Sequence, residues 1–155
     1  MRTFITIACL AVAGCQSDFL GYGPEECTTA PSAKQVERCR EVMYINPDLK
    51  IEPLGYCFKP DLDSSIRFKF IAKTNDPSQV FVSSRVDASK FNDRFRKSAL
   101  EVNANVGWWD VSSLRLEGAN LDVPSPSGSE FRGLDVGYTK NADGTLTVYV
   151  FWWET

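Results

Sequence analysis

Alternating apolar and polar residues mark the clearest β-strand of the chain. The apolar residues Ile66, Phe68, Phe70 and Ala72 alternate with Arg67, Lys69, Ile71 and Lys73. Successive side chains of a strand point to opposite faces of the sheet, so this pattern predicts a half-buried strand. We expect β-structure from about residue 51 onward, with a further short strand at 80–82 and one or two strands over 106–117.

The last 25 residues predict a β-hairpin of defined register. Residues 141–144 read Asn-Ala-Asp-Gly, which fits a three-residue loop with Gly144 in the left-handed region. Pairing Asn141 with Thr145 sets the following residues opposite one another: Tyr138 and Val148, Val136 and Val150, Leu134 and Trp152 on one face, and Gly137 and Tyr149, Asp135 and Phe151, Gly133 and Trp153 on the other. Every pair on the first face is apolar, and a shift by one residue would mix the faces.

Two segments have the signals of amphipathic helices. Ser32 and Gln35 form a capping-box pattern at the start of a helix to about residue 44, which carries Val36, Cys39 and Met43 on one face. A second helix is predicted over 87–102 with Asp87 as its N-cap. Its apolar stripe contains Phe91, Phe95, Ala99 and Val102, and its separate basic face, formed by Lys90, Arg94 and Lys97, is expected to be solvated.

These elements predict one α+β domain over residues 32–155. We expect an antiparallel sheet of about five to seven strands with one or two helices packed on it and a β-hairpin at the C-terminus. The Gly- and Pro-containing stretch of residues 15–31 is predicted to be the tether between an N-terminal anchor and this domain.

The N-terminus is patterned as an export signal. Arg2 precedes an apolar run over residues 4–13, and small residues follow it. This run is shorter than the roughly 20 residues that a membrane-spanning helix needs, and we see no later segment that is long and apolar enough.

Residues 12–15, Val-Ala-Gly-Cys, resemble the bacterial lipobox. The resemblance implies a signal peptide over 1–14, diacylglycerol on the Cys15 thiol, and a mature protein held in the cell envelope by its lipid, at the outer membrane facing the periplasm if the source is Gram-negative. Two or more acyl chains would anchor the protein firmly, since each buried CH₂ contributes about 0.8 kcal/mol. Two alternatives remain open. Residues 11–13, Ala-Val-Ala, also fit an ordinary signal-peptidase site that would release a soluble secreted protein, and the run could instead be a buried strand or helix.

The amino-acid composition limits the kinds of catalytic, metal and nucleic-acid-binding site that the chain can form. The chain has 17 basic and 20 acidic residues, a net charge of −3, and no histidine. A nucleic-acid partner is disfavoured by this balance, and the lack of histidine excludes Ser-His-Asp and Cys-His catalysis and His-ligated zinc. Without a recognisable motif, we expect neither a cofactor nor a metal.

The cysteines after residue 15 predict one disulfide. Cys27, Cys39 and Cys57 remain if Cys15 is lipidated, whereas a free Cys15 would allow two bridges. Because the helix of residues 32–44 turns Cys39 inward, we expect Cys39 to pair with Cys27 or Cys57.

An aromatic face is the strongest candidate for a binding surface. The hairpin register places Tyr149, Phe151 and Trp153 on one side of the last strand, and Trp109 of the Trp108-Trp109 pair is a candidate neighbour. Exposed aromatic patches mark sites for partners or ligands, sugar rings among them. The alternative is that a helix, such as 87–102, covers this face as a second core layer.

The function expected from these features is a non-enzymatic envelope lipoprotein that binds a protein or cell-wall partner, with an inhibitor or immunity-type protein as one concrete version. One alternative is a glycan hydrolase that uses Asp or Glu, for which Asp110 and Glu154 are candidates because each follows a tryptophan. A purely structural surface lipoprotein is another.

Overall fold

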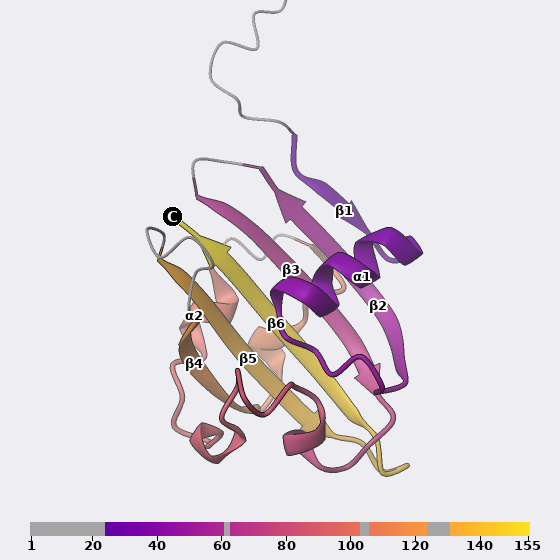
Figure 1. Cartoon of the computed structure of the whole chain (residues 1–155), viewed down its shortest axis with the longest axis vertical. Helices are drawn as coiled ribbons and strands as arrows, with labels where there is room; N and C mark the ends of the chain where they lie inside the picture. Colours follow the sequence, from indigo (N-terminus) through magenta and orange to yellow (C-terminus); the bar gives the residue numbers. More distant parts are fainter. Residues whose placement is uncertain (1–23, 61–62, 103–105, 124–130) are drawn as a thin grey trace, which may run out of the picture.

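Six antiparallel strands form one sheet in the order β1-β2-β3-β6-β5-β4 (Figure 1). The computed structural model describes residues 24–60, 63–102, 106–123 and 131–155. Its strands are β1 (Glu26–Thr28), β2 (Ile51–Lys59), β3 (Ser64–Ala72), β4 (Glu117–Val123), β5 (Arg132–Lys140) and β6 (Leu146–Glu154). Its helices are α1 (Ala33–Val42) and α2 (Ser98–Glu101), with short 3₁₀ turns η1 (Pro77–Gln79), η2 (Ala88–Lys90) and η3 (Val111–Ser113). The predicted α+β class and C-terminal hairpin are confirmed.

The hairpin has the predicted register. All six cross-strand pairs occur as expected, among them Leu134 with Trp152 and Gly133 with Trp153. Asn141 N–H donates to the Thr145 carbonyl at 2.9 Å, and Gly144 has a φ of +78°. Local turn chemistry therefore determines how β5 and β6 align.

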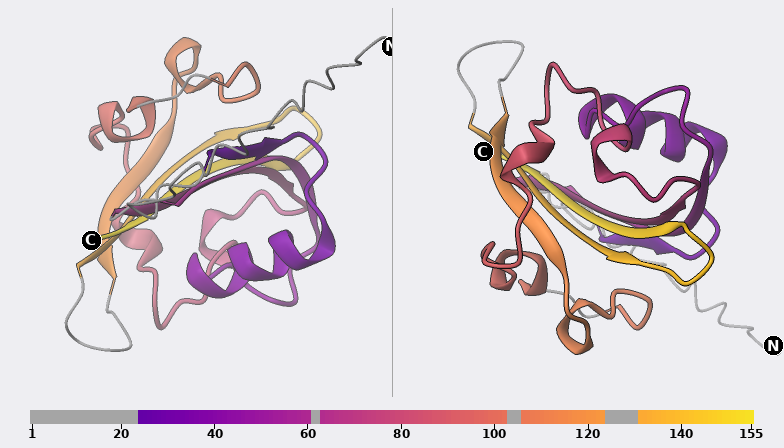
Figure 2. Two further views of the ribbon diagram at one scale, coloured as in Figure 1. Left: turned by 90° about the horizontal axis from the view of Figure 1, so that it is seen from above. Right: turned by 90° about the horizontal axis from the view of Figure 1, so that it is seen from below.

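The sheet lies between two layers (Figure 2). On one face, α1 and the segment after β3 cover a core that includes Ile66, Phe68 and Phe70. Ser32 forms the predicted capping box with Gln35, and the helix buries Cys39. On the opposite face, α2 and η3 enclose a smaller cluster around Leu100 and Tyr149.

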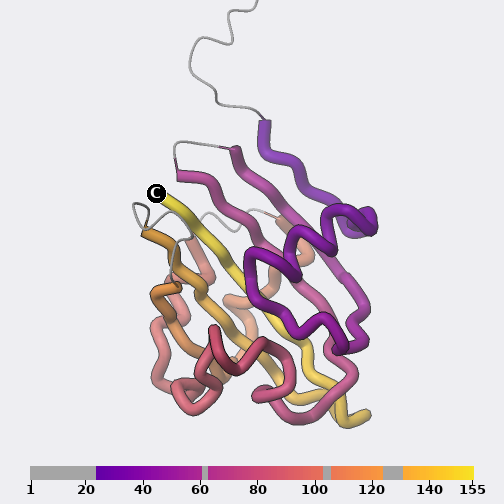
Figure 3. Tube along the Cα trace, viewed as in Figure 1, coloured from indigo at the N-terminus to yellow at the C-terminus, as the bar shows by residue number. Residues whose placement is uncertain are grey.

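The continuous helix predicted over 87–102 is wrong. Asp87 does cap a helical turn, η2, but the chain then pairs with an edge of the sheet. Asn92 and Gly118 of β4 exchange two backbone hydrogen bonds of 2.9 Å. Phe91 consequently packs with the first core and Phe95 with the second, so this segment passes around the β4 edge from one face to the other (Figure 3).

Other expectations also need correction. Residues 106–116 contain η3 and turns instead of strands. Residues 80–82 contribute only an isolated bridge, from Phe81 to Ile45. Residues 26–28, placed in the tether by composition, form β1 and pair with β2. Within the described ranges, no helix has the length and apolar character needed to cross a membrane. Cys15 and the apolar run before it lie outside the described residues.

Candidate functional site

The structure divides the predicted aromatic face into a buried and an accessible part. Tyr149 is 1% exposed and Trp109 3% exposed, because α2 and η3 cover them. Phe151 and Trp153, further along β6, are only half-buried. The covering layer predicted as the alternative therefore exists over Tyr149 and Trp109, but it ends before Trp153.

Trp153 lies flat on the sheet because its neighbour is a glycine. A Cβ atom at Gly133 would fall well under 3.0 Å from Cε2, Cζ2 and Nε1 of the Trp153 ring, so the ring occupies the space that a side chain would take. An aromatic ring over a strand glycine is a stabilising arrangement. At the other glycine of this face, Gly137, the side chains of Leu100 and Leu116 occupy the space above the backbone, although its cross-strand partner is Tyr149.

The carboxylate of Asp135 is a hydrogen-bond partner of the Trp153 indole. The Trp153 side chain donates a hydrogen bond to the Asp135 carboxylate, and Asn120 Nδ2 donates a second one at 2.6 Å. Asp135 is only 5% exposed, and this burial raises the pKa of its carboxyl although both hydrogen bonds act in the opposite direction. The buried carboxylate therefore accepts hydrogen bonds from both Trp153 and Asn120.

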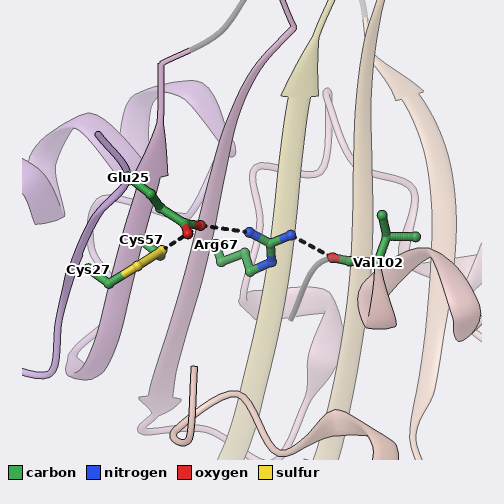
Figure 4. Close-up of a disulfide and its surroundings, with 5 residues drawn as sticks. All are labelled: Glu25, Cys27, Cys57, Arg67 and Val102. Atoms are coloured by element: carbon green, nitrogen blue, oxygen red, sulfur yellow. Dashed lines mark hydrogen bonds and ion pairs between the residues drawn. A yellow bond between two sulfur atoms is a disulfide. The ribbon is translucent and has the colours of Figure 1, made fainter. Parts of the chain in front are cut away.

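Phe151 is held from the other side by Arg67. The Arg67 guanidinium lies 4.8 Å from the centre of the Phe151 ring, a cation–π distance. As Figure 4 shows, Arg67 also contacts Glu25 at 3.5 Å and donates to the Val102 carbonyl at 2.6 Å. Arg67 is 3% exposed, and burial lowers the pKa of its guanidinium. It therefore links the N-terminal segment, the sheet and the layer above it.

The predicted pairing of Cys39 is wrong. The disulfide joins Cys27 to Cys57, which are directly opposite in β1 and β2, and Cys39 is a free thiol. Cys57 pairs with Arg67 and so points to the second face of the sheet, whereas Cys39 points from α1 onto the first face. A Glu25 carboxylate oxygen lies 3.1 Å from Cys57 Sγ (Figure 4), but sulfurs joined in a disulfide are not thiolate ligands for a metal.

Two hollows flank the pair formed by Phe151 and Trp153, which we call the aromatic ridge. The hollow over β5 has a volume of about 430 Å³, and its remaining lining residues are Arg96, Ser98, Ala99, Val102 and Asp135. The hollow over β3 has a volume of about 300 Å³, and its remaining lining residues are Lys59, Asp63, Ser65, Arg67 and Thr155. Because β6 lies between β3 and β5, the ridge separates the hollows. Each hollow offers both hydrogen-bond donors and acceptors.

The two carboxylates suggested for catalysis do not meet. Asp110 binds Lys69 Nζ at 2.7 Å and the Tyr149 hydroxyl at 2.8 Å, above the second face. Burial alone would raise the pKa of Asp110, but these hydrogen bonds lower it overall. Glu154 alternates with Trp153 along β6 and therefore points to the first face, where it pairs with Arg132 at 2.7 Å.

A further hollow of about 470 Å³ lies beside Tyr138 at the β4 edge. Two pairs of its lining residues interact with each other: the Tyr138 hydroxyl donates to Glu117, and Arg115 lies 3.9 Å from Asp93. Tyr138 is buried, so this hollow presents no accessible aromatic ring. The aromatic ridge is the better candidate for a binding site.

Sequence reasoning missed Arg67 and Asp135 as site residues. Both are charged residues at strand positions, and the signal that could have found them was their place opposite Phe151 in adjacent strands. Of the predicted residues, the structure unites Phe151 with Trp153 at the surface and buries Tyr149 with Trp109, while Cys15 is outside the described residues.

Comparison of the chain with protein-family models, curated protein sequences and solved structures finds no match.

Proposed function

We propose that this chain is a bacterial cell-envelope lipoprotein, anchored through lipid on Cys15, that binds a protein or cell-wall partner without catalysing a reaction. The observation that carries the proposal is the aromatic ridge. Phe151 and Trp153 are half-buried on a sheet face where Tyr149 and Trp109 are fully covered, and a hollow with polar groups lies on each side of the pair. Aromatic residues held rigidly at a surface supply contact area at low entropic cost.

The place of the ridge fits an anchored protein. Pro24, the first described residue, immediately precedes Glu25 and β1, and the start of β1 lies at the same end of the sheet as the end of β6 (Figure 1). Eight residues separate Cys15 from Pro24, a length that spans at most about 30 Å when fully extended. A lipid on Cys15 would hold the ridge close to the membrane surface, where envelope components are available.

A glycan hydrolase is the second candidate, because Asp135 is a buried carboxyl beside the ridge and its pKa is raised. General acids of hydrolases have this property. In the two hollows that flank the ridge, the other carboxylate among the described lining residues is Asp63, four residues before Arg67 on the β3 side. Four residues along a strand and two strands across give a backbone separation of about 16 Å. The paired carboxyls of hydrolases are about 5 to 10 Å apart, so the geometry favours binding.

Affinity capture of the lipidated protein from membranes tests the proposal. We expect specific material to co-purify with the wild type and to be lost with Trp153→Ala, but not with Phe131→Ala. Phe131 is a matched control because it is 80% exposed, lies directly before β5 and only two residues from Gly133, and lines neither hollow. Glycan turnover by the purified protein would overturn the non-enzymatic role. Intact mass tests the anchor, since an unmodified protein that begins before Cys15 would contradict it.

A further inference from the structure

We infer that the ligand of the aromatic ridge is a neutral glycan of more than one sugar unit. One of its rings stacks on Trp153, and the hydroxyl groups of the glycan enter the two hollows. This inference rests on the proposed binding role and names the class of ligand. It follows from the shape of the ridge, from the charge of the hollows and from their spacing.

The shape fits a ring with a flat apolar face. The inner face of the Trp153 indole rests on Gly133, and the side chain remains half-exposed, so the opposite face of the ring is the one available to a ligand. The indole also donates a hydrogen bond to the buried Asp135 carboxylate. A sugar ring presents C–H groups on its face and hydroxyls at its rim, which matches an aromatic surface with polar groups on both sides.

The charge of the hollows favours a neutral ligand. The hollow over β5 contains Asp135 and Arg96, and the hollow over β3 contains Asp63, Lys59 and Arg67. Each hollow places at least one carboxylate beside at least one basic group, so neither presents a surface of one sign to a polyanion or a polycation. A hydroxyl group both donates and accepts hydrogen bonds, so it is satisfied by the mixed set in each hollow.

The spacing calls for more than one sugar unit. The hollows lie over β3 and β5, on either side of β6, and two strand spacings are about 10 Å. A single ring on Trp153 would not fill both hollows. A disaccharide or a longer chain would cross the ridge and place hydroxyls in each.

Calorimetric titration of the mature protein in detergent with chitotetraose and cellotetraose tests the inference. We expect saturable binding of at least one of these neutral probes and at least a tenfold loss of affinity with Trp153→Ala. Gly133→Ala should weaken binding as well, because it displaces the indole without removing it, whereas Phe131→Ala should leave affinity unchanged. A sulfated oligosaccharide and a proline-rich peptide serve as probes of other chemistry and should not bind at the ridge.

The outcomes separate the inference from the proposed function. If neither neutral glycan binds while membrane capture still depends on Trp153, the glycan inference is overturned and the binding role stands. Tighter binding of the sulfated probe or of the peptide at Trp153 would also overturn the inference. If binding of glycans and capture of partners are both unaffected by Trp153→Ala, both proposals are wrong. Retained circular dichroism spectra of all variants establish that each one is folded.

Discussion

Gly133 should be intolerant of a side chain because of the Trp153 ring above it. In Gly133→Ala, the new methyl group would contact three ring atoms at well under 3.0 Å, so the indole must move. Overpacking of this kind costs about 1–3 kcal/mol. Alanine is favoured over glycine within a strand by about 0.5–1 kcal/mol. The net expectation is a loss of up to about 2.5 kcal/mol in the free energy of unfolding.

A double-mutant cycle isolates the contact with the ring. In a Trp153→Ala background, the obstacle is absent and Gly133→Ala should stabilise the protein by about 0.5–1 kcal/mol. The difference between the two backgrounds equals the cost of the clash, about 1–3 kcal/mol. Urea denaturation followed by far-UV circular dichroism measures all four proteins.

Gly107→Ala is the matched control for this cycle. A Cβ atom at Gly107 meets no other atom within 4 Å, so its effect should be small and the same in both backgrounds. An equal cost of Gly133→Ala with and without Trp153 would refute the stacked geometry, because the ring would then not occupy the space above the glycine.

The remaining predictions concern titratable and disulfide groups. Reducing the bond between Cys27 and Cys57, which are 30 residues apart, should lower the free energy of unfolding by about 3–4 kcal/mol; no change in the urea midpoint would contradict this. Burial raises the pKa of the Cys39 thiol to about 12, so Cys39 should react with a thiol reagent only in denaturant, and rapid labelling of the native protein would disprove its burial. The raised pKa of Asp135 means that the folded state holds its proton more tightly. Stability should therefore fall as pH rises from the unfolded value near 3.9 through the higher folded value, and Asp135→Asn should remove this component in pH-dependent urea titrations. Parallel curves for wild type and variant would count against the prediction.

Local patterns were sufficient for the elements whose partners are close in sequence. The β5–β6 register follows from the turn at Asn141–Gly144 and from a face on which every pair is apolar. The start of α1 follows from Ser32 and Gln35, which contact each other directly. In both cases, the residues that decide the structure lie within about 20 positions of one another.

Contacts distant in sequence decided the elements that were predicted wrongly. The spacing of Phe91 and Phe95 fits one helical stripe, but the backbone of Asn92 pairs with Gly118, and the two rings lie on opposite faces of the sheet. Cys39 does point inward, as predicted. However, this sheet is covered on both faces, and Cys39 lies in the core on the first face whereas Cys57 points to the second face.

The extent of the site could not be derived for the same reason. The sequence placed Phe151 and Trp153 on one face but could not show where the covering layer ends. The edge of the covering layer depends on how α2 packs over Tyr149. It also depends on the hydrogen bond of 2.7 Å that the Trp109 indole donates to the Leu100 carbonyl.

The most direct test of the ridge as a ligand site is the indole N–H region of the proton–nitrogen NMR spectrum. The chain has four tryptophans, and Trp153→Phe assigns the resonance of interest. During titration with a neutral tetrasaccharide, the Trp153 signal should shift progressively to saturation, while that of Trp109, whose side chain is 3% exposed, should stay in place. An unchanged Trp153 signal at saturating ligand, or a larger shift at Trp109, would contradict the account.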